Sequence, residues 1–175
     1  HLLIKSGRIP KIPIYVDSPL ATNVTDVFRA HPECFDKEVY DEFFKNNKNP
    51  FGFGMLKYTN SVQESKNLNN IHGPMIIISA SGMCEFGRVL HHLNNNLSDP
   101  KNLVLIVGYQ AQNTLGRKLV NGDKSVKIFG EMVDVKAEVA VVDAFSGHAD
   151  RSDLIDFISH VKGVKEVFVV HGEEN

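Results

Sequence analysis

The chain has 175 residues, 42% hydrophobic and 23% charged, which is enough to bury the core of one domain or slightly more. Its 19 Lys and Arg against 21 Asp and Glu leave a net charge of −2, which excludes a polycation that binds nucleic acid through its overall field. Cys34 and Cys84 lie far apart without CxxC spacing, which argues against a disulfide scaffold and fits a cytoplasmic location. No apolar run approaches membrane-spanning length and no signal peptide opens the chain, so we expect no membrane partner.

The first half of the chain begins with "HLLI", which reads as the end of a helix. A short β-rich run, "IPIYV" (12–16), leads through "DSPLAT" to helical apolar spacing at 23–31. A second helix is predicted over 34–44, where apolar residues again recur at helical spacing. A short polar helix over 61–70 begins at Ser61, which is a good N-cap.

The strand–loop–helix unit then recurs twice. The apolar run "MIIIS" (75–79) precedes a small-residue loop and a helix over 88–97, whose apolar residues fall on one face. The run "LVLIVG" (103–108) precedes a helix that Thr114 can cap and Gly122 can end. This alternation predicts an α/β fold: a mostly parallel sheet with helices on both faces.

The last part of the chain changes pattern after Gly122. Alternating residues over 125–145, with a turn at 130–131, predict a β-hairpin. A helix over 151–162 follows, capped by Asp150 and ended by Gly163. The run "KEVFVV" (165–170) predicts a final buried strand.

The loops after the three parallel strands should share one edge of the sheet, because ligands of such sheets bind at the carboxyl ends of the strands. We therefore expect Asp17 and Ser18, the loop 79–83 and residues 110–114 to form one rim. Small residues beside a helix N-terminus favour an anion site, for which we predict Ser81, Gly82 and Arg88 as phosphate ligands. A tight turn needed only for packing explains the same loop, since glycine-rich loops alone are weak signals.

Gln110 and Arg117 are further predicted phosphate ligands at this edge. Capping by Thr114 and a solvated arginine are the simpler explanation, although they leave the glutamines of "GYQAQN" unexplained. The adjacent His91 and His92 point about 100° apart on a helix, so they cannot both face one ligand. Both are expected to be structural, with at most one of them near the rim.

Two histidines near the end of the chain suggest part of a site. His148 in "DAFSGHADRSDL" is not needed to cap the helix, and His171 follows a strand 23 positions later, one helix and one strand away. Both would reach the same sheet edge, as half of a metal site. An ordinary hydrogen-bonded loop histidine remains the alternative for His148. No HxH, HxxxH or CxxC motif accompanies them.

Five ordered motifs together resemble the metallo-β-lactamase superfamily nucleases that carry a β-CASP domain. They are "SASGMCEFGRVLHHL", "VGYQAQNTLGRKL", "VKIFGEMVDVKAEV", "FSGHAD" and "VVHGEEN". The resemblance implies a β-CASP domain over 1–145 and a returning segment of the metallo-β-lactamase domain over 146–175. It covers nearly the whole chain and is closest to the bacterial RNA-degrading and 3′-end-processing enzymes.

The resemblance also implies roles for three residues. His148 would hydrogen-bond the scissile phosphate and protonate the leaving oxygen, Ser146 would contact a phosphate beside it, and His171 would bind the second of two zinc ions. The family's HxHxDH metal motif is absent from this sequence, so we expect this chain alone to hold no zinc and to be inactive. The expected partner is single-stranded RNA, with DNA as a further possibility.

Two other functions compete with this one. A non-catalytic RNA-binding or scaffold paralogue would keep the fold without the chemistry, and a Rossmann-type nucleotide domain is disfavoured by the missing GxGxxG. The apolar strand 166–170 would be an exposed edge in the isolated chain, which predicts either a homodimer or a loosely held segment.

Overall fold

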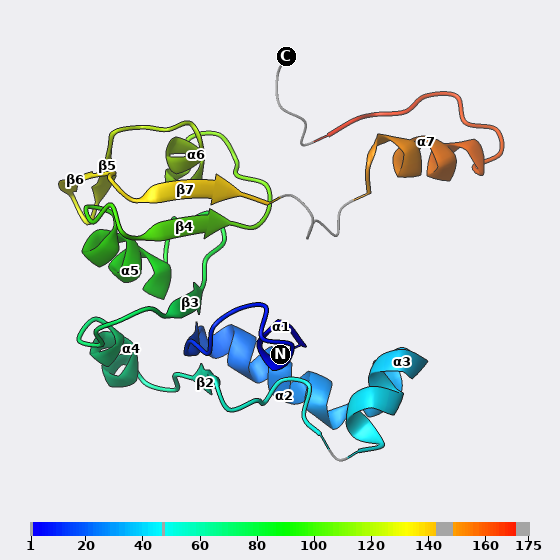
Figure 1. The fold of residues 1–175 in the computed structure, drawn as a ribbon. Helices are drawn as coiled ribbons and strands as arrows, with labels where there is room; N and C mark the ends of the chain where they lie inside the picture. Colours follow the sequence, from blue (N-terminus) through cyan, green and yellow to red (C-terminus); the bar gives the residue numbers. More distant parts are fainter. Residues whose placement is uncertain (1, 47, 143–148, 171–175) are drawn as a thin grey trace.

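The computed structural model describes residues 2–46, 48–142 and 149–170 of the chain (Figure 1). A parallel three-stranded sheet has the order β2-β1-β3 and is formed by β1 (Ile14–Asp17), β2 (Leu56–Tyr58) and β3 (Ile76–Ser79). A second sheet pairs β4 (Leu103–Ile106) with β7 (Glu138–Val141), also in parallel. The predicted α/β class with parallel pairing is confirmed.

The helices alternate with these strands along the chain. They are α1 (Leu2–Lys5), α2 (Pro19–Ala30), α3 (Lys37–Val39), α4 (Val62–Leu68), α5 (Arg88–Asn96), α6 (Leu115–Val120) and α7 (Arg151–Ser159). A 3-10 turn, η1 (Pro32–Cys34), and a π-helical turn, η2 (Tyr40–Phe44), flank α3. In the part of the chain that the structure describes, no helix combines the length and the apolar character needed to cross a membrane.

The predicted helix caps are present. Ser61 and Asp150 each form a capping box with the acidic residue three positions later, at the starts of α4 and α7. The Thr114 hydroxyl accepts a hydrogen bond from the backbone N–H of Arg117, 3.2 Å away, at the start of α6. These contacts form within one turn, which is why the local sequence is sufficient to predict them.

Strand pairing departs from the sequence prediction in three places. Only β5 (Ser125–Ile128) and β6 (Glu131–Asp134) form the hairpin, and the residues expected to continue it become β7 and join β4. The apolar run of β4 therefore pairs with β7 and not with β1 or β3. The strand β2 is not among the predicted elements, because its three residues become a strand only through pairing with β1.

Two further elements differ from the prediction. The helix expected over 34–44 begins at Lys37, because the Asp36 carboxylate accepts a hydrogen bond from the N–H of Val39 and caps it there. The expected strand 165–170 is not formed. Its side chains are open to solvent, with Phe168 81% and Val169 87% exposed, and no described segment pairs with them.

The hydrophobic core lies between the β4–β7 sheet, the β5–β6 hairpin and helices α5 and α6. Its most completely buried side chains are Leu97, Leu119, Val126 and Ile128, all at most 2% exposed. The predicted apolar face of α5 faces this core. The apolar face predicted for α2 is not buried in this core, since Val24, Val27 and Phe28 are 44%, 60% and 46% exposed.

Candidate functional site

The candidate site is built around Asp17, the last residue of β1. Asp17 stands opposite Ser79 in the register of β1 and β3, and the Ser79 hydroxyl donates to the Asp17 carbonyl over 3.0 Å. The Asp17 side chain is completely buried. A buried carboxylate requires hydrogen-bond donors, since an unpaired buried charge is strongly unfavourable.

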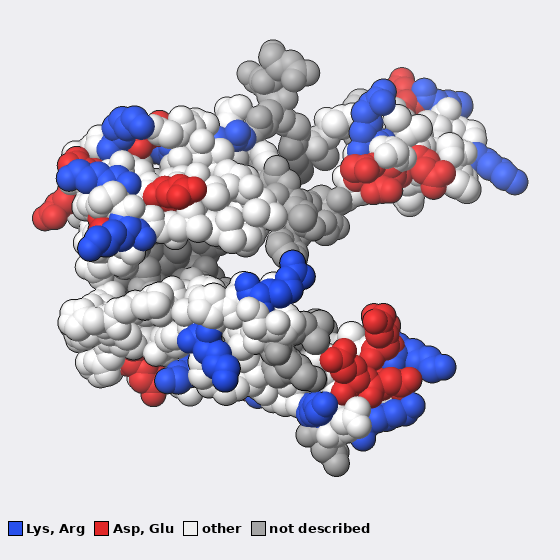
Figure 2. All heavy atoms as spheres, in the orientation of Figure 1, with Lys and Arg blue, Asp and Glu red and all other residues white. Residues whose placement is uncertain are grey.

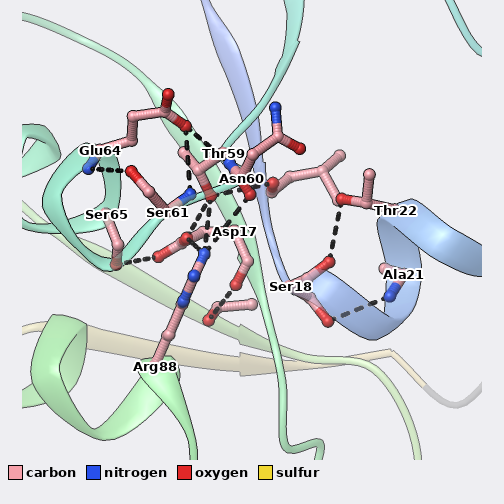
Figure 3. A network of polar contacts seen from close by, with 12 residues as sticks. Asp17, Ser18, Ala21, Thr22, Thr59, Asn60, Ser61, Glu64, Ser65 and Arg88 are labelled. Carbon is pink, nitrogen blue, oxygen red and sulfur yellow. Dashed lines mark hydrogen bonds and ion pairs between the residues drawn. The ribbon is translucent and has the colours of Figure 1, made fainter.

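Donors from three further elements surround this carboxylate (Figure 3). The Ser65 hydroxyl of α4 lies 2.6 Å from Oδ2. The His92 Nε2 of α5 lies 2.6 Å from the same oxygen. The Arg88 Nη1, at the start of α5, lies 2.6 Å from Oδ1, and the Thr59 hydroxyl after β2 donates to the same oxygen. We call Asp17, Thr59, Ser65, Arg88 and His92 the Asp17 network.

These contacts set the ionisation of Asp17. Burial by itself would raise the pKa of the carboxyl, but the hydrogen bonds from Ser65, Thr59, His92 and Arg88 outweigh burial and lower the pKa to about 2. Asp17 is therefore a carboxylate at any ordinary pH, and its charge is matched by the guanidinium of Arg88.

Arg88 was predicted as a phosphate ligand, and the structure engages one of its nitrogens with the protein. Besides Asp17, its Nη1 donates to the Thr59 hydroxyl over 3.0 Å and to the Thr59 carbonyl over 3.4 Å. Its Nη2 and Nε make no hydrogen bond with any described residue. The side chain is 16% exposed, and Nη2 and Nε are not among the described nitrogens that are both fully buried and unpaired, so this edge of the guanidinium is accessible.

The loop 80–87 between β3 and α5 is closed at its base. The N–H of Val89 donates to the Ala80 carbonyl over 3.2 Å, and that of Ser81 donates to the Phe86 carbonyl over 3.0 Å. Gly87 is required here, because its φ of +89° suits glycine and a Cβ would lie 2.6 Å from the Ala80 oxygen. The Ser81 hydroxyl is buried and makes no hydrogen bond within the described part of the chain.

The same loop is joined to the turn between β4 and α6. The Gln110 Nε2 donates to the Gly82 carbonyl over 3.0 Å, and the N–H of Gly116 donates to the Met83 carbonyl over 3.0 Å. The Glu85 carboxylate accepts a hydrogen bond from the N–H of Leu115. These contacts confirm the predicted proximity of the loops after β3 and β4, and they explain why Gln110 is buried. The hydrogen bond between Ser79 and Asp17 brings the end of β1 beside the end of β3.

Arg117 lies on the same side of the turn. Its guanidinium carbon is 5.5 Å from the centre of the Tyr109 ring, an arrangement typical of a cation–π contact. Nothing in these contacts tests whether Arg117 or the other predicted ligands bind phosphate, so those roles stay predictions.

Three members of the Asp17 network were not predicted from the sequence to be site residues: Thr59, Ser65 and His92. His92 was expected to be structural; it is 7% exposed and reaches Asp17, while His91 packs against the ring of Phe129 at 4.7 Å. One signal was available, because Arg88 and His92 are four residues apart and so share a helix face. The hydroxyl donors had no such signal, since Thr59 and Ser65 are 42 and 48 residues from Asp17.

Three predicted residues lie outside the described ranges: Ser146, His148 and His171. Among residues 2–46, 48–142 and 149–170, no group of three or more His, Cys, Asp or Glu side chains is placed to hold a metal ion. The proposed zinc ligand His171 is thus untested by this structure.

Comparison with known proteins defines the class. The Beta-Casp domain model matches residues 1–119, and the model described as a Zn-dependent metallo-hydrolase RNA specificity domain matches residues 132–175. The chain therefore belongs to the β-CASP family of metallo-β-lactamase nucleases, and the resemblance seen in its motifs is confirmed.

Several curated proteins are similar over most of this chain. Ribonuclease TTHA0252 of Thermus thermophilus is 41% identical over 167 residues, covering 95% of this chain and 38% of that protein. Transcription termination factor FttA of Methanosarcina mazei is 33% identical over 177 residues, covering 98% of this chain and 28% of that protein. FttA of Thermococcus kodakarensis is 34% identical, covering 93% and 26%. The chain thus spans well under half of the length of these relatives.

Proposed function

We propose that this chain is the β-CASP part, with a returning metallo-β-lactamase segment, of a zinc-dependent hydrolase that cleaves phosphodiester bonds of RNA. The observation that carries the proposal is the joined rim, in a chain of this family: the last residues of β1 and β3 are hydrogen-bonded to each other, and the loop after β3 is hydrogen-bonded to the turn after β4. The names of the similar ribonuclease and termination factors, and the RNA specificity domain match, support RNA as the substrate.

In this proposal the rim residues grip the phosphate backbone. Ser81, Gly82, Arg88, Gln110 and Arg117 would form the wall against which the strand lies, through backbone amides, hydroxyls and guanidinium groups. Such contacts carry no base information, so sequence preference should be weak. On the face drawn in Figure 2, Lys and Arg are interspersed with Asp and Glu, in keeping with a local phosphate site and not a broad basic surface.

The chemical step would use residues outside the described ranges. Ser146 would hold the phosphate, and His148 would give its proton to the oxygen that leaves when water attacks the phosphorus and the P–O bond breaks. Two zinc ions in the full-length protein would activate that water, with His171 as a ligand of one of them. The described residues contain no three-ligand cluster, so the other ligands would come from elsewhere in the protein.

The test is cleavage of a labelled single-stranded RNA, and of DNA of the same sequence, by the full-length protein that contains this chain. We expect about two zinc ions per chain and a loss of roughly 10²- to 10⁴-fold in rate for His148→Ala, the usual contribution of a general acid. His160→Ala is the matched control, because His160 is exposed at the end of α7 and its hydrogen bonds with described residues are all to its own helix.

A second candidate function is an RNA-binding or scaffold protein without catalysis. The similarity to proteins named transcription termination factors supports this candidate. The same assay separates the two. RNA binding without zinc and without cleavage would establish the scaffold and return His148 to an ordinary loop histidine.

A further inference from the structure

We propose that Asp17 and Thr59 are positioning residues that hold Arg88 by a single nitrogen, so that the other edge of its guanidinium is presented to a backbone phosphate of the nucleic acid. This inference rests on the proposed function, since it names how that rim would bind its substrate. It assigns a role to a buried carboxylate that lies one layer behind the predicted phosphate ligands.

The first support is how Arg88 is shared between protein and solvent. Its Nη1 is saturated by contacts to Asp17 and Thr59, whereas Nη2 and Nε have no partner among the described residues. A guanidinium offers donors on a planar fork that fits two oxygens of a phosphate at once. With one corner fixed, the remaining Nη2–Nε edge keeps that geometry without the entropy loss of ordering a free side chain.

The second support is the position of Arg88 in the fold. Arg88 is the first residue of α5, directly after the loop 80–87, whose base is closed by the hydrogen bond from Val89 to Ala80. That loop is tied to the turn that carries Gln110 through the Gly82 carbonyl. Anchoring Arg88 to Asp17 therefore places the start of α5, its loop and the neighbouring turn in one arrangement relative to β1.

The third support is that the anchor is built to be permanent. Asp17 is completely buried, stays ionised because its hydrogen bonds lower its pKa to about 2, and is held by His92 and Ser65 on its other oxygen. A carboxylate whose remaining lone pairs are occupied cannot rotate away from Arg88. An arginine that served only to neutralise a buried carboxylate would gain nothing from an accessible Nη2–Nε edge, whereas an arginine that binds a phosphate requires one.

The matched pair of hydroxyls gives a sharp test. Thr59 and Ser65 both donate to the Asp17 carboxylate and are 4% and 7% exposed, but only Thr59 also contacts Arg88. We would compare Thr59→Val, Ser65→Ala, Arg88→Lys and the control Arg8→Lys, which lies before β1 in the chain and outside the Asp17 network. All would be made in the full-length protein carrying His148→Ala, so that bound RNA is not cut.

The probe is a fluorescently labelled single-stranded oligouridylate, and the readouts are Kd at several salt concentrations and the melting temperature. We expect Arg88→Lys to weaken binding about tenfold and to lower the slope of log K against log salt by about 0.7, the loss of one phosphate contact on a single strand. Lysine can keep the ion pair with Asp17 but has no second edge to offer. Thr59→Val should weaken binding several-fold, whereas Ser65→Ala keeps both contacts of Arg88 and should weaken binding clearly less at a similar loss of melting temperature.

Two results would overturn the inference alone: an unchanged salt slope in a folded Arg88→Lys protein, or equal Kd values for Thr59→Val and Ser65→Ala. Either would leave the network a purely structural tie while the proposed function stands. Failure of the parent protein to bind the oligouridylate at all would overturn the proposed function, and this inference with it.

Discussion

Two regions of the structure both contain helices with apolar side chains, but only one of the regions buries them. In residues 48–142 the helices α5 and α6 bury Leu97 and Leu119 to 0% and 1% exposure. In residues 149–170 no described residue is buried, and Leu154, Ile155 and Phe157 of α7 are 52%, 52% and 71% exposed. In Figure 1, α7 lies apart from both sheets.

Both regions nevertheless contain a well-capped helix. Thr114 caps α6, and Asp150 caps α7 with a complete capping box. A cap satisfies backbone N–H groups within one turn, whereas burial needs an apolar surface supplied from elsewhere in the chain. The comparison shows that a helix can be specified locally and still have no packing partner in the described part of the chain.

The largest effect should come from removing the centre of the polar network in the packed region. Asp17→Ala leaves the largely buried Arg88 without its counter-charge, and breaking a pair whose carboxylate is completely buried should cost about 3 kcal/mol. Urea denaturation measures the change in the free energy of unfolding. Asp156→Ala on α7 is the control, because its side chain is 76% exposed and the unfolding midpoint should stay in place.

The next effect is cavity formation in the apolar core. Leu97→Ala should destabilise the chain by about 3 kcal/mol, within the usual range for a fully buried leucine. Leu154→Ala on α7 should change the unfolding free energy by less than about 0.5 kcal/mol, because its side chain is already half exposed. Comparable losses at the two positions would show that α7 is packed after all.

Gly116 in α6 lies close to Gln110 and Met83 at the rim. At Gly116 a Cβ would lie 1.7 Å from the Gln110 Oε1, so Gly116→Ala should displace Gln110 from Gly82 and cost about 1–3 kcal/mol. Gly54→Ala is the matched control, because a Cβ there meets nothing within 4 Å. Thermal unfolding of both variants gives the comparison.

Removing a helix cap should have different consequences in the two regions: a change in global stability for α6 and only local opening for α7. Thr114→Ala should lower the global unfolding free energy by about 1 kcal/mol, since α6 belongs to the core. Asp150→Ala should leave the global transition unchanged and only speed hydrogen exchange of the α7 amides, because none of its residues is buried. A shift of the global transition by Asp150→Ala would contradict the separation.

Acid should act on the packed region through Asp17. Its folded pKa of about 2 lies below the value of 3.8 for an unperturbed carboxyl, so the unfolded chain takes up the proton first. The contribution of Asp17 to stability is complete above about pH 4 and should be lost progressively as the pH falls through about 2. Stability measured against pH should show this loss in the parent chain and a smaller one in Asp17→Asn.

The sequence was sufficient for the parts of the site that depend on neighbours along the chain. The order of strand, loop and helix placed Asp17, Ser81 and Gln110 near the carboxyl ends of their strands, and the loop contacts confirm that placement. The motifs identified the family, which the match over residues 1–119 confirms. The roles of His148 and His171 remain predictions, since both lie outside the described residues.

The sequence by itself determined the helix caps, the glycine turns and the periodicity of each element, because these depend on contacts within a few residues. Only the tertiary structure decided that β4 pairs with β7, and that the Asp17 carboxylate gathers Thr59, Ser65, Arg88 and His92. Such choices depend on which distant groups can satisfy a strand edge or a buried charge. These pairings depend on burial and hydrogen bonding between distant parts of the chain, so they cannot be predicted from any short stretch of sequence.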